Sequence, residues 1–339
     1  MRRFLTTGLI FTVVAACTIT SLHAATDVVI GSGNFSPIVQ DLDKSLDFYA
    51  DLLGVDAPGT APRPFGADPA LVNFLGTPAG QVRFASVRIP GSPMAVEIVD
   101  FKDVDRKPLL PRLQDPGAVR LILIVRNIDT LLAHLKQKGV PVVTAGRAPV
   151  NLTQGGKARA VVVKDPDGFF VEIRQPDLLP ETTAPATSNV VGARFGLTIA
   201  DTDQTMRVYR DLLGFQPQID ASFSNDKASN DLMATANAQV RRSLATVPGS
   251  TLQVEFLEFK GIERKPLGAR IQDPGATRLQ LRVRDSDAVV KTLTAAGGTV
   301  VTTGGDGGPI NMRGLRVALV RELNNLFLVI MAQGAPPAR

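Results

Sequence analysis

The chain alternates short apolar runs with amphipathic stretches in an order that recurs. Residues 41–54, DLDKSLDFYADLLG, place apolar side chains at helical spacing between a capping Asp41 and a terminating Gly54. A second stretch of this kind follows the apolar run RLILIVR and ends at Gly139. Apolar runs such as AVEIVDF and ARAVVVK flank these helices, and the turn DPDG joins ARAVVVK to the next apolar run, FFVEIRQ. The pattern predicts strand–helix–strand–strand–strand units, an α+β fold with curled mixed sheets.

The whole pattern is present twice. FKDVDRKPLLPRLQDPGAVRL (101–121) and FKGIERKPLGARIQDPGATRL (259–279) are identical at 14 of 21 positions. We therefore expect two tandem domains, at residues 26–178 and 189–335, each made of a pair of βαβββ units. Residues 179–188, rich in Pro and Thr, are expected to form the linker between them.

The first residues differ in character from the rest. MRRF is basic, an apolar run follows, and small residues precede Thr26. This order predicts a secretory signal peptide at residues 1–25, and hence a periplasmic or secreted protein. The alternative is a lipoprotein, because VAAC, which ends at Cys17, also fits a lipid-attachment signal that would anchor the protein to a membrane.

Composition narrows the possible chemistry. Loss of residues 1–25 removes Arg2 and Arg3 and lowers the net charge from +5 to about +3, which gives no case for nucleic-acid binding. No apolar run is long enough to predict a membrane span. The same cleavage removes the single cysteine and leaves His134 as the only histidine, in a segment that predicts an exposed helix surface. A thiolate nucleophile, a His general base and a two-His metal site are therefore not expected.

Two motifs carry a family resemblance. D-L-x-K-S-L-x-F-Y-x-D-L-L-G after a strand, with K-D-P-D-G-F-F-V-E-I later, resembles the vicinal oxygen chelate superfamily, which includes glyoxalase I, extradiol dioxygenases and bleomycin resistance proteins. The resemblance extends over both halves. It implies a curled sheet around a divalent metal with up to four ligands, usually His at the first and third positions and Glu at the second and fourth.

Counting back from the expected helix caps places these four positions on the sequence. They fall on Asn34, Glu97, Arg120 and Glu172 in the first half, and on Arg194, Glu255, Arg278 and Val329 in the second. None is a histidine, and an arginine stands at the third position of both halves. The resemblance implies that the four positions of one half share a site.

Three interpretations of these arginines remain open. Arg120 between Glu97 and Glu172 would be a structural ion cluster in place of a metal, because an arginine offsets the cost of burying carboxylates. Arg120 or Arg278 would alternatively bind an anionic ligand through its planar fork of donors. The third interpretation is a metal held by Glu97 and Glu172 alone. We expect no bound metal and no other cofactor, with a divalent metal in the first domain as the alternative.

The repeated stretch also carries charged loops. The four basic residues of its RKPL segments are predicted to be solvated: Arg106, Lys107, Arg264 and Lys265. Asp115 and Asp273 are expected to cap or brace the loop. The loop could serve as a lid or as a contact between the two domains, which we expect to pair within the chain.

Three functions fit these residues. The first is a binding protein for a small anionic or aromatic molecule, with Asn34, Arg120, Arg194, Glu255 and Arg278 as candidate ligand-binding residues. The second is a lyase- or isomerase-type enzyme, with Glu97 or Glu172 as the catalytic base and Arg120 as the charge stabiliser. The third is a structural or interaction module.

Overall fold

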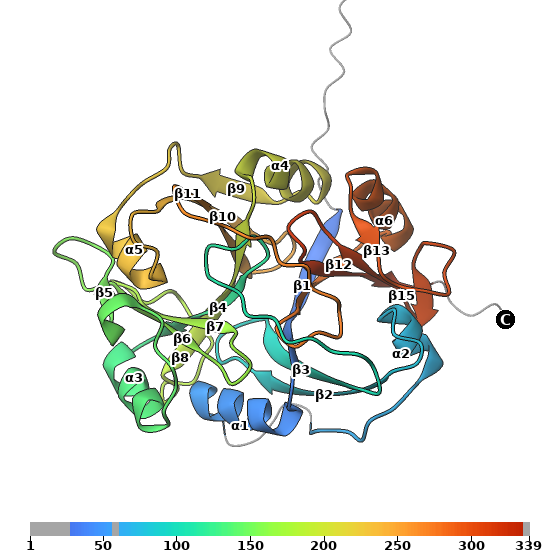
Figure 1. The fold of residues 1–339 in the computed structure, drawn as a ribbon, viewed down its shortest axis with the longest axis horizontal. Helices are drawn as coiled ribbons and strands as arrows, with labels where there is room; N and C mark the ends of the chain where they lie inside the picture. Colours follow the sequence, from blue (N-terminus) through green and yellow to red (C-terminus); the bar gives the residue numbers. More distant parts are fainter. Residues whose placement is uncertain (1–27, 56–60, 335–339) are drawn as a thin grey trace, which may run out of the picture.

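The computed structural model describes residues 28–55 and 61–334 (Figure 1). The predicted signal peptide at residues 1–25 and the alternative lipid anchor at Cys17 lie outside these residues. Across the described ranges, no helix is both long and apolar enough to cross a membrane.

The strands form two mixed sheets of eight strands each. Sheet A has the order β13-β15-β16-β12-β1-β3-β2 with β14 paired to β15, and sheet B has the order β5-β6-β7-β4-β8-β11-β10-β9. The strands of sheet A are β1 (Val29–Val39), β2 (Gln81–Arg88), β3 (Ala95–Lys102), β12 (Thr277–Val283), β13 (Thr299–Val300), β14 (Ile310–Met312), β15 (Leu315–Arg321) and β16 (Phe327–Gln333). The strands of sheet B are β4 (Val119–Val125), β5 (Val150–Asn151), β6 (Arg159–Lys164), β7 (Phe170–Gln175), β8 (Val190–Ile199), β9 (Gln216–Ile219), β10 (Gln239–Thr246) and β11 (Gln253–Lys260).

These strands confirm the predicted α+β fold of four units, two in each sheet. Each unit begins with one of the strands β1, β4, β8 or β12 and continues with a helix and the strands that follow. The first unit has the fewest strands in its described part: only β2 and β3 follow its helices, and Gly66 forms an isolated bridge to Val82 next to β2.

The pairing of the units crosses the sequence repeat. β1 pairs antiparallel with β12, and β4 pairs antiparallel with β8, so each sheet takes one unit from each half of the chain. The sequence interpretation grouped the two units of one half, and the structure corrects that grouping. The first strands of the four units, β1, β4, β8 and β12, have similar apolar patterns. These patterns do not specify which of the four strands pair with each other.

Four helices lie on the outer side of the sheets, in two neighbouring pairs (Figure 1). They are α1 (Leu42–Leu53), α3 (Ile128–Gln137), α4 (Thr202–Met206), which continues into a π-helical segment, and α6 (Ser286–Ala295). Asp41 caps α1 through its side chain, and Gly54 ends it with φ 64°, as predicted. His134 of α3 lies at the surface, with Nε2 2.8 Å from Oδ2 of Asp51 in α1, which confirms the expectation of a helix-surface histidine.

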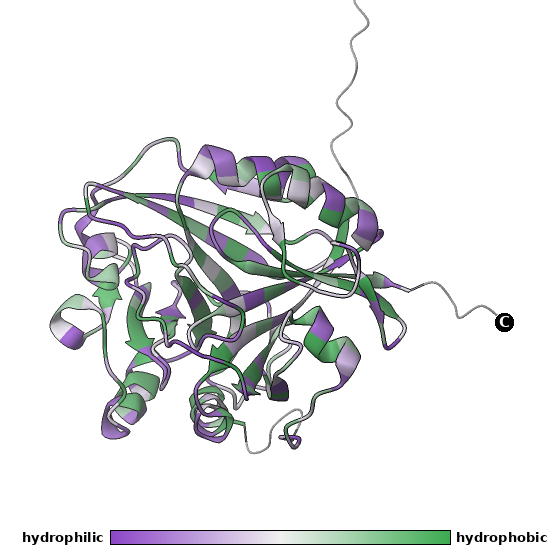
Figure 2. Ribbon diagram, turned by 45° about the vertical axis from the view of Figure 1, so that its right-hand side comes forward, coloured by the Kyte–Doolittle hydropathy of each residue, from purple (hydrophilic) through white to green (hydrophobic). Residues whose placement is uncertain are grey.

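One large apolar core joins the helices to the backs of both sheets. Tyr49 and Tyr209 are fully buried in it, and the rings of Phe35 and Phe195 pack edge to face at 6.0 Å across the two sheets. Figure 2 shows the hydrophobic residues along the strands and the hydrophilic ones on outer helix turns and loops. This core holds the two sheets together as one body.

The opposite face of each sheet, called here its inner face, is covered by a short helix. α2 (Pro69–Phe74) covers the inner face of sheet A, where Phe74 and Leu75 join a second apolar cluster. α5 (Lys227–Met233) covers the inner face of sheet B in the same way, through Leu232 and Met233. The inner faces carry the positions predicted for a site.

The two repeated loops hold each other across the molecule. Lys107 N donates to Asp273 Oδ1 at 2.8 Å, and Lys265 N donates to Asp115 Oδ1 at 2.8 Å. Each aspartate also pairs with an arginine of its own loop, at 2.8 Å for Asp115 and 2.7 Å for Asp273. Of the roles left open by the sequence, the aspartates therefore brace the loops, and the loops make a contact between the two halves.

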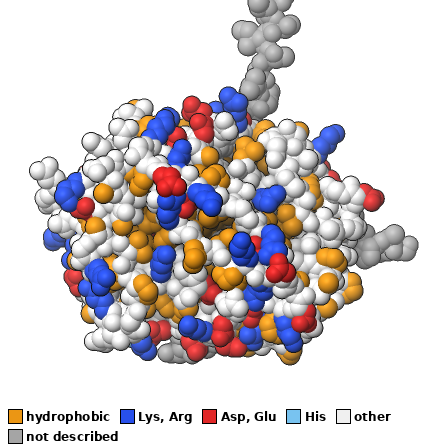
Figure 3. All heavy atoms as spheres, viewed as in Figure 1, with side chains coloured by type: hydrophobic (Ala, Val, Ile, Leu, Met, Phe, Trp, Pro, Cys, Tyr) orange, Lys and Arg blue, Asp and Glu red, His pale blue; other side chains and the backbone are white. Residues whose placement is uncertain are grey.

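One loop prediction is wrong. The side chain of Arg106 is only 13% exposed, and it donates to Phe101 O at 2.6 Å and to the carbonyl of Val39. It is held there because the turn after β3 brings these carbonyls and Asp100 together. Lys107 and Lys265 are exposed as predicted, while Arg264 is half-buried. On the face shown in Figure 3, basic and acidic side chains are interspersed, in keeping with the small net charge.

Candidate functional site

Sheet B carries a buried ion cluster on its inner face. Arg120 of β4 places Nη1 3.1 Å from Glu172 Oε2 of β7, and Nη2 3.0 Å from Glu255 Oε1 of β11. All three side chains are at most 1% exposed. The guanidinium therefore bridges two carboxylates that come from different halves of the chain.

Two further arginines complete this cluster. Arg174 Nε donates to Glu172 Oε1 at 2.8 Å and Nη1 to Glu255 Oε2 at 3.3 Å, while Arg242 Nε lies 3.5 Å from Glu255 Oε2. Burial by itself would raise the pKa of Glu255, but the charges of Arg174, Arg120 and Arg242 together hold it below its ordinary value. Glu255 therefore stays ionised, and the inner face of sheet B is closed by charge pairs.

Arg194 lies beside this cluster on β8. Burial, and then the charge of Arg174, lowers the pKa of this half-buried guanidinium from its ordinary value. Arg194 lines an open pocket together with Ile124, Gln253 and linker residues 180–183. It therefore lies near Glu255 but outside the network of ion pairs.

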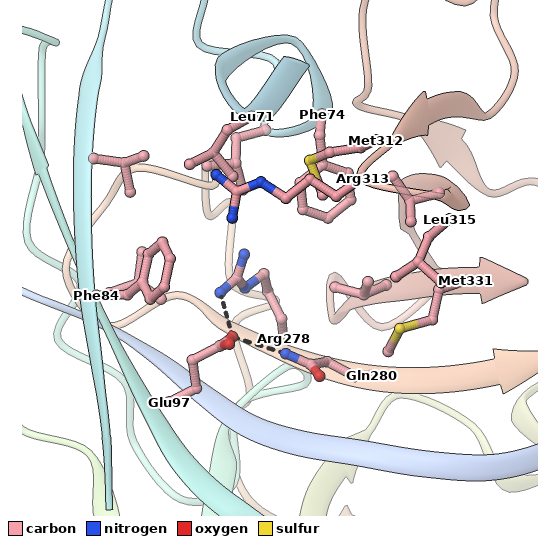
Figure 4. Close-up of a pocket in the computed structure, with 15 residues that line it drawn as sticks. Leu71, Phe74, Phe84, Glu97, Arg278, Gln280, Met312, Arg313, Leu315 and Met331 are labelled. Carbon is pink, nitrogen blue, oxygen red and sulfur yellow. Dashed lines mark hydrogen bonds and ion pairs between the residues drawn. The ribbon is translucent and has the colours of Figure 1, made fainter. Parts of the chain in front are cut away.

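Sheet A carries a different arrangement at the matching positions. Glu97 of β3 receives three donors on a single oxygen, Oε2: Ser36 Oγ at 2.9 Å, Arg278 Nη2 at 3.0 Å and Gln280 Nε2 at 2.7 Å. The Glu97 side chain is 24% exposed, whereas the Arg278 side chain is 6% exposed. This pair forms the floor of a pocket (Figure 4).

The pocket has a cavity volume of about 170 Å³ and mostly apolar walls. Figure 4 shows Phe84, Met312, Leu315 and Met331 around it, with Arg313 above and Glu97 below. β12 pairs with β16 as β4 pairs with β7, since Arg278 and Arg120 each stand opposite a phenylalanine. The third and fourth family positions are thus related in the same way in both sheets.

The match between the sheets explains why Arg278 faces a pocket, whereas Arg120 is enclosed by ion pairs. Val329 and Met331 of sheet A stand where sheet B has Glu172 and Arg174. In the aligned segments QVRF and QVRR, Phe84 stands where sheet B has Arg242. Three apolar side chains therefore line the inner face of sheet A at the positions that complete the charge network in sheet B.

The predicted positions come together, but not in the predicted groups. Arg120 was expected to lie between Glu97 and Glu172; it lies instead between Glu172 and Glu255, while Glu97 pairs with Arg278 in the other sheet. The crossed pairing of units is the physical reason. A single site that uses Glu97 and Glu172 together, as metal ligands or as catalytic residues, is therefore not formed.

Asn34 takes a supporting position. Its Oδ1 accepts a hydrogen bond from Ala95 N at 3.2 Å, and its own N–H donates to Gln280 Oε1 at 3.2 Å. It orients β3 and Gln280 and is not among the pocket-lining residues.

Sequence reasoning missed Arg174, Arg242, Gln280 and Arg313. Arg174 and Gln280 stand two residues after Glu172 and Arg278 on the same strands, so strand periodicity places them on the same face. That spacing was a usable signal. Arg313 lies in a turn between strands, and nothing in the local pattern brings it to the pocket.

A family profile described as the Glyoxalase/Bleomycin resistance protein/Dioxygenase superfamily matches residues 33–173. The second half repeats this segment in sequence and in fold. Residues 33–173 thus match this superfamily, and the internal repeat extends the likeness to the second half. No curated protein sequence matches the chain.

Two solved structures share the fold of the chain. Glyoxalase I from Zea mays superposes with a TM-score of 0.55 at 15% identity, over 91% of this chain and 92% of that one. A protein from Bacillus subtilis described as a putative dioxygenase superposes with a TM-score of 0.54 at 13% identity, over 92% of this chain and 87% of that one. At such identities the likeness establishes the fold alone.

The divalent metal that the superfamily resemblance implies does not fit either set of residues. In sheet B, Arg120 already brings a positive charge to within 3.1 Å of both carboxylates. In sheet A, Glu97 faces Arg278, and Val329 offers no donor. Throughout the described part of the chain, no group of three or more His, Cys, Asp or Glu side chains is arranged to hold a metal ion.

Proposed function

We propose that this protein binds one small organic molecule in the pocket of sheet A and that sheet B is a closed structural counterpart. The observation that carries the proposal is the contrast between the inner faces. One encloses about 170 Å³ between apolar walls and a buried arginine, and the other is filled by ion pairs. An apolar cavity of about 150 Å³ holds benzene, so the expected ligand has the size of one ring.

Binding without chemistry is the function that these residues support best. Glu172 is fully buried and paired with Arg120 and Arg174, so it has no access to a substrate. His134 lies on the outer surface, away from the pocket. The residues present supply walls, one buried positive charge and hydrogen-bonding groups, which are what a binding site needs.

A second candidate function, proton abstraction by Glu97, has one observation in its favour. All three donors to Glu97 reach Oε2, and the partly exposed carboxylate lines the pocket, so that Oε1 is the oxygen left for a bound molecule. A carbon acid with its proton at Oε1 and its developing charge near Arg278 would fit this arrangement. Glu97→Gln keeps the shape of the side chain but removes the base. If the wild-type protein turns over a bound carbon acid and this variant does not, the result favours the enzyme.

We further propose that the protein acts outside the cytoplasm, in the periplasm or as a secreted protein. The basic start, apolar run and small residues of positions 1–25 support this proposal. Mass spectrometry of the protein recovered from its native cell distinguishes a new N-terminus near Thr26 from a lipid-modified Cys17.

The test of the proposed function uses the full chain and a panel of one-ring compounds, neutral and anionic. Saturation-transfer NMR should detect at least one compound that binds the wild-type protein in a 1:1 ratio. Leu315 lines the pocket and is only half-buried, so Leu315→Trp should fill the cavity and remove the signal. Leu323→Trp is the matched control, because Leu323 is 42% exposed and lies outside the pocket. A panel without any binder, or binding that survives Leu315→Trp, would contradict the proposal.

A further inference from the structure

The pocket of sheet A has a second arginine above its floor, and this points to the chemistry of the ligand. We propose that Arg313 is a ligand-binding residue and that the ligand is a small carboxylate, of about one ring, held between Arg278 and Arg313. This inference rests on the proposed function and adds the ligand class to it.

Arg278 has donors to spare. Its side chain is 6% exposed, and Nη2 donates to Glu97 Oε2 at 3.0 Å. A guanidinium carries five N–H donors in one plane, and this single bond to Glu97 uses one of them. Arg278 lines the pocket, and Figure 4 shows its guanidinium at the floor, below Arg313. An anionic group in the cavity would therefore meet a positive charge there.

Arg313 occupies a backbone position that seldom holds an arginine. It forms the two-residue turn between β14 and β15 with Gly314, at φ 52° and 79°, so both residues are left-handed. Asn, Asp and Gly usually fill such a turn, because a larger side chain is strained there. Figure 4 shows that this turn brings the Arg313 side chain over the pocket, opposite Arg278. Strain at a pocket-lining residue is the kind of outlier that accompanies a ligand contact.

The present partner of Arg313 is a replaceable one. Nη2 lies 3.2 Å from Oδ2 of Asp68, and the two side chains are 60% and 44% exposed. Exposed ion pairs contribute little to stability. Asp68 caps α2, which also supplies Leu71 and Phe74 to the pocket. The pair therefore spans the mouth of the pocket, and a ligand carboxylate can take the place of Asp68 at small cost.

The charges that line the pocket favour an anion. Arg278 and Arg313 contribute two positive charges and Glu97 one negative charge, so the lining has a net charge of +1. Ser36, Gln280 and Arg278 all donate to Oε2 of Glu97, which offsets the negative charge of this carboxylate. A carboxylate between two guanidinium groups would form charge-assisted hydrogen bonds, while its ring would lie against Phe84 and Met331.

The experiment compares sodium benzoate with benzamide, which has the same ring but a neutral amide, by calorimetric titration of the full chain. We expect benzoate to bind at least about tenfold more tightly. Arg313→Asn, which tolerates the left-handed turn, should bring the two affinities to within about threefold. Arg316→Asn is the matched control on the next strand, because Arg316 pairs with Asp287 outside this pocket, and it should keep the preference.

A gain-of-affinity variant tests the exchange with Asp68. Asp68→Asn keeps a good helix cap but releases Arg313, so benzoate affinity should rise by about threefold. Equal affinities of benzoate and benzamide, or a preference that persists in Arg313→Asn, would overturn this inference. It would also fall if a neutral compound occupied the pocket and benzoate did not, but the proposed function would then stand. If no compound bound at all, both proposals would fall.

Discussion

Arg120 fits against sheet B because residue 196 is a glycine. The two residues stand opposite each other on β4 and β8. A Cβ atom at Gly196 would lie 3.0 Å from both Nε and Nη2 of Arg120, closer than such atoms normally approach. The buried guanidinium therefore depends on an absent side chain in the other half of the chain.

Gly196→Ala should destabilise the protein by about 1–3 kcal/mol, because the added methyl group displaces the buried arginine that bridges Glu172 and Glu255. Gly192→Ala on the same strand is the control, since its Cβ would meet nothing closer than 3.7 Å. Urea unfolding of both variants measures the difference. Equal effects at the two positions would show that Arg120 is free to move.

Removal of the arginine should cost more in sheet B than in sheet A. Arg120→Met leaves Glu172 and Glu255 buried with one cation fewer, and we expect a loss of about 3 kcal/mol in the free energy of unfolding. Arg278→Met should cost about 1 kcal/mol, because Glu97 is partly exposed and keeps two donors. Thermal and urea unfolding of the two variants test this order. The reverse order would mean that the buried cluster is not the stabilising one.

The two loop aspartates should act as a unit. Asp115→Ala and Asp273→Ala each remove hydrogen bonds to an arginine and to a backbone N–H of the other loop, at about 2 kcal/mol each. Because each loop holds the other, the double variant should lose less free energy of unfolding than the sum of the losses in the two single variants. Asp105→Ala, which removes a carboxylate that is 86% exposed, should change little. A double-mutant cycle by urea unfolding measures the coupling, and strict additivity would contradict it.

Asp165 should make stability depend on pH. Burial, opposed by the Tyr49 hydrogen bond and reinforced by the Asp167 charge, raises the pKa of this carboxyl from 3.8 to about 7. Between the unfolded-state and folded-state pKa values, Asp165 binds more protons in the folded state than in the unfolded state. Its contribution to stability therefore falls as pH rises from about 4 to about 7.

Asp165→Asn removes that contribution. The stability of the variant relative to wild type should therefore increase with pH over this window, by at most about 1.4 kcal/mol per pH unit. Asp47→Asn, on the exposed side of α1, is the control and should run parallel to wild type. Urea unfolding at pH 4.5, 5.5 and 6.5 gives the slopes, and a variant parallel to wild type would sink the prediction.

Elemental analysis of the protein, purified without chelators or nickel columns, should find no stoichiometric divalent metal, because Arg120 and Arg278 already occupy the carboxylates. The double variant Arg278→His/Val329→Glu is the positive control, since with Glu97 it presents three metal ligands on the inner face of sheet A. Near-stoichiometric metal in wild type would contradict the interpretation of the arginines.

Local signals in the sequence predicted much of the fold. Asp41 and Gly54 mark the ends of α1 because capping and left-handed termination depend on residues within one turn. The family spacing likewise put Glu97, Arg120 and Arg278 on strands and on inner faces. These features need no knowledge of distant parts of the chain.

The pairing of units had no such local signal. Whether β1 pairs with β4 or with β12 depends on contacts such as that between Phe35 and Phe195, which join residues from different halves. Likewise, Arg313 reaches the pocket only through a turn whose place depends on β15. Such relationships arise from the summed packing of many residues, and apolar periodicity does not encode them.

The crossed sheets also set an order of folding. Sheet B is complete when β11 ends at Lys260, whereas β1 waits for β12, with Val29 opposite Val283, 254 positions later (283 − 29). Closure of so long a loop is slow, since its entropy is lost before the contacts form. Until then, the earliest strand of the chain presents an open edge, which invites association with other chains. Newly made protein should therefore depend on protection of β1 for as long as its partner is missing.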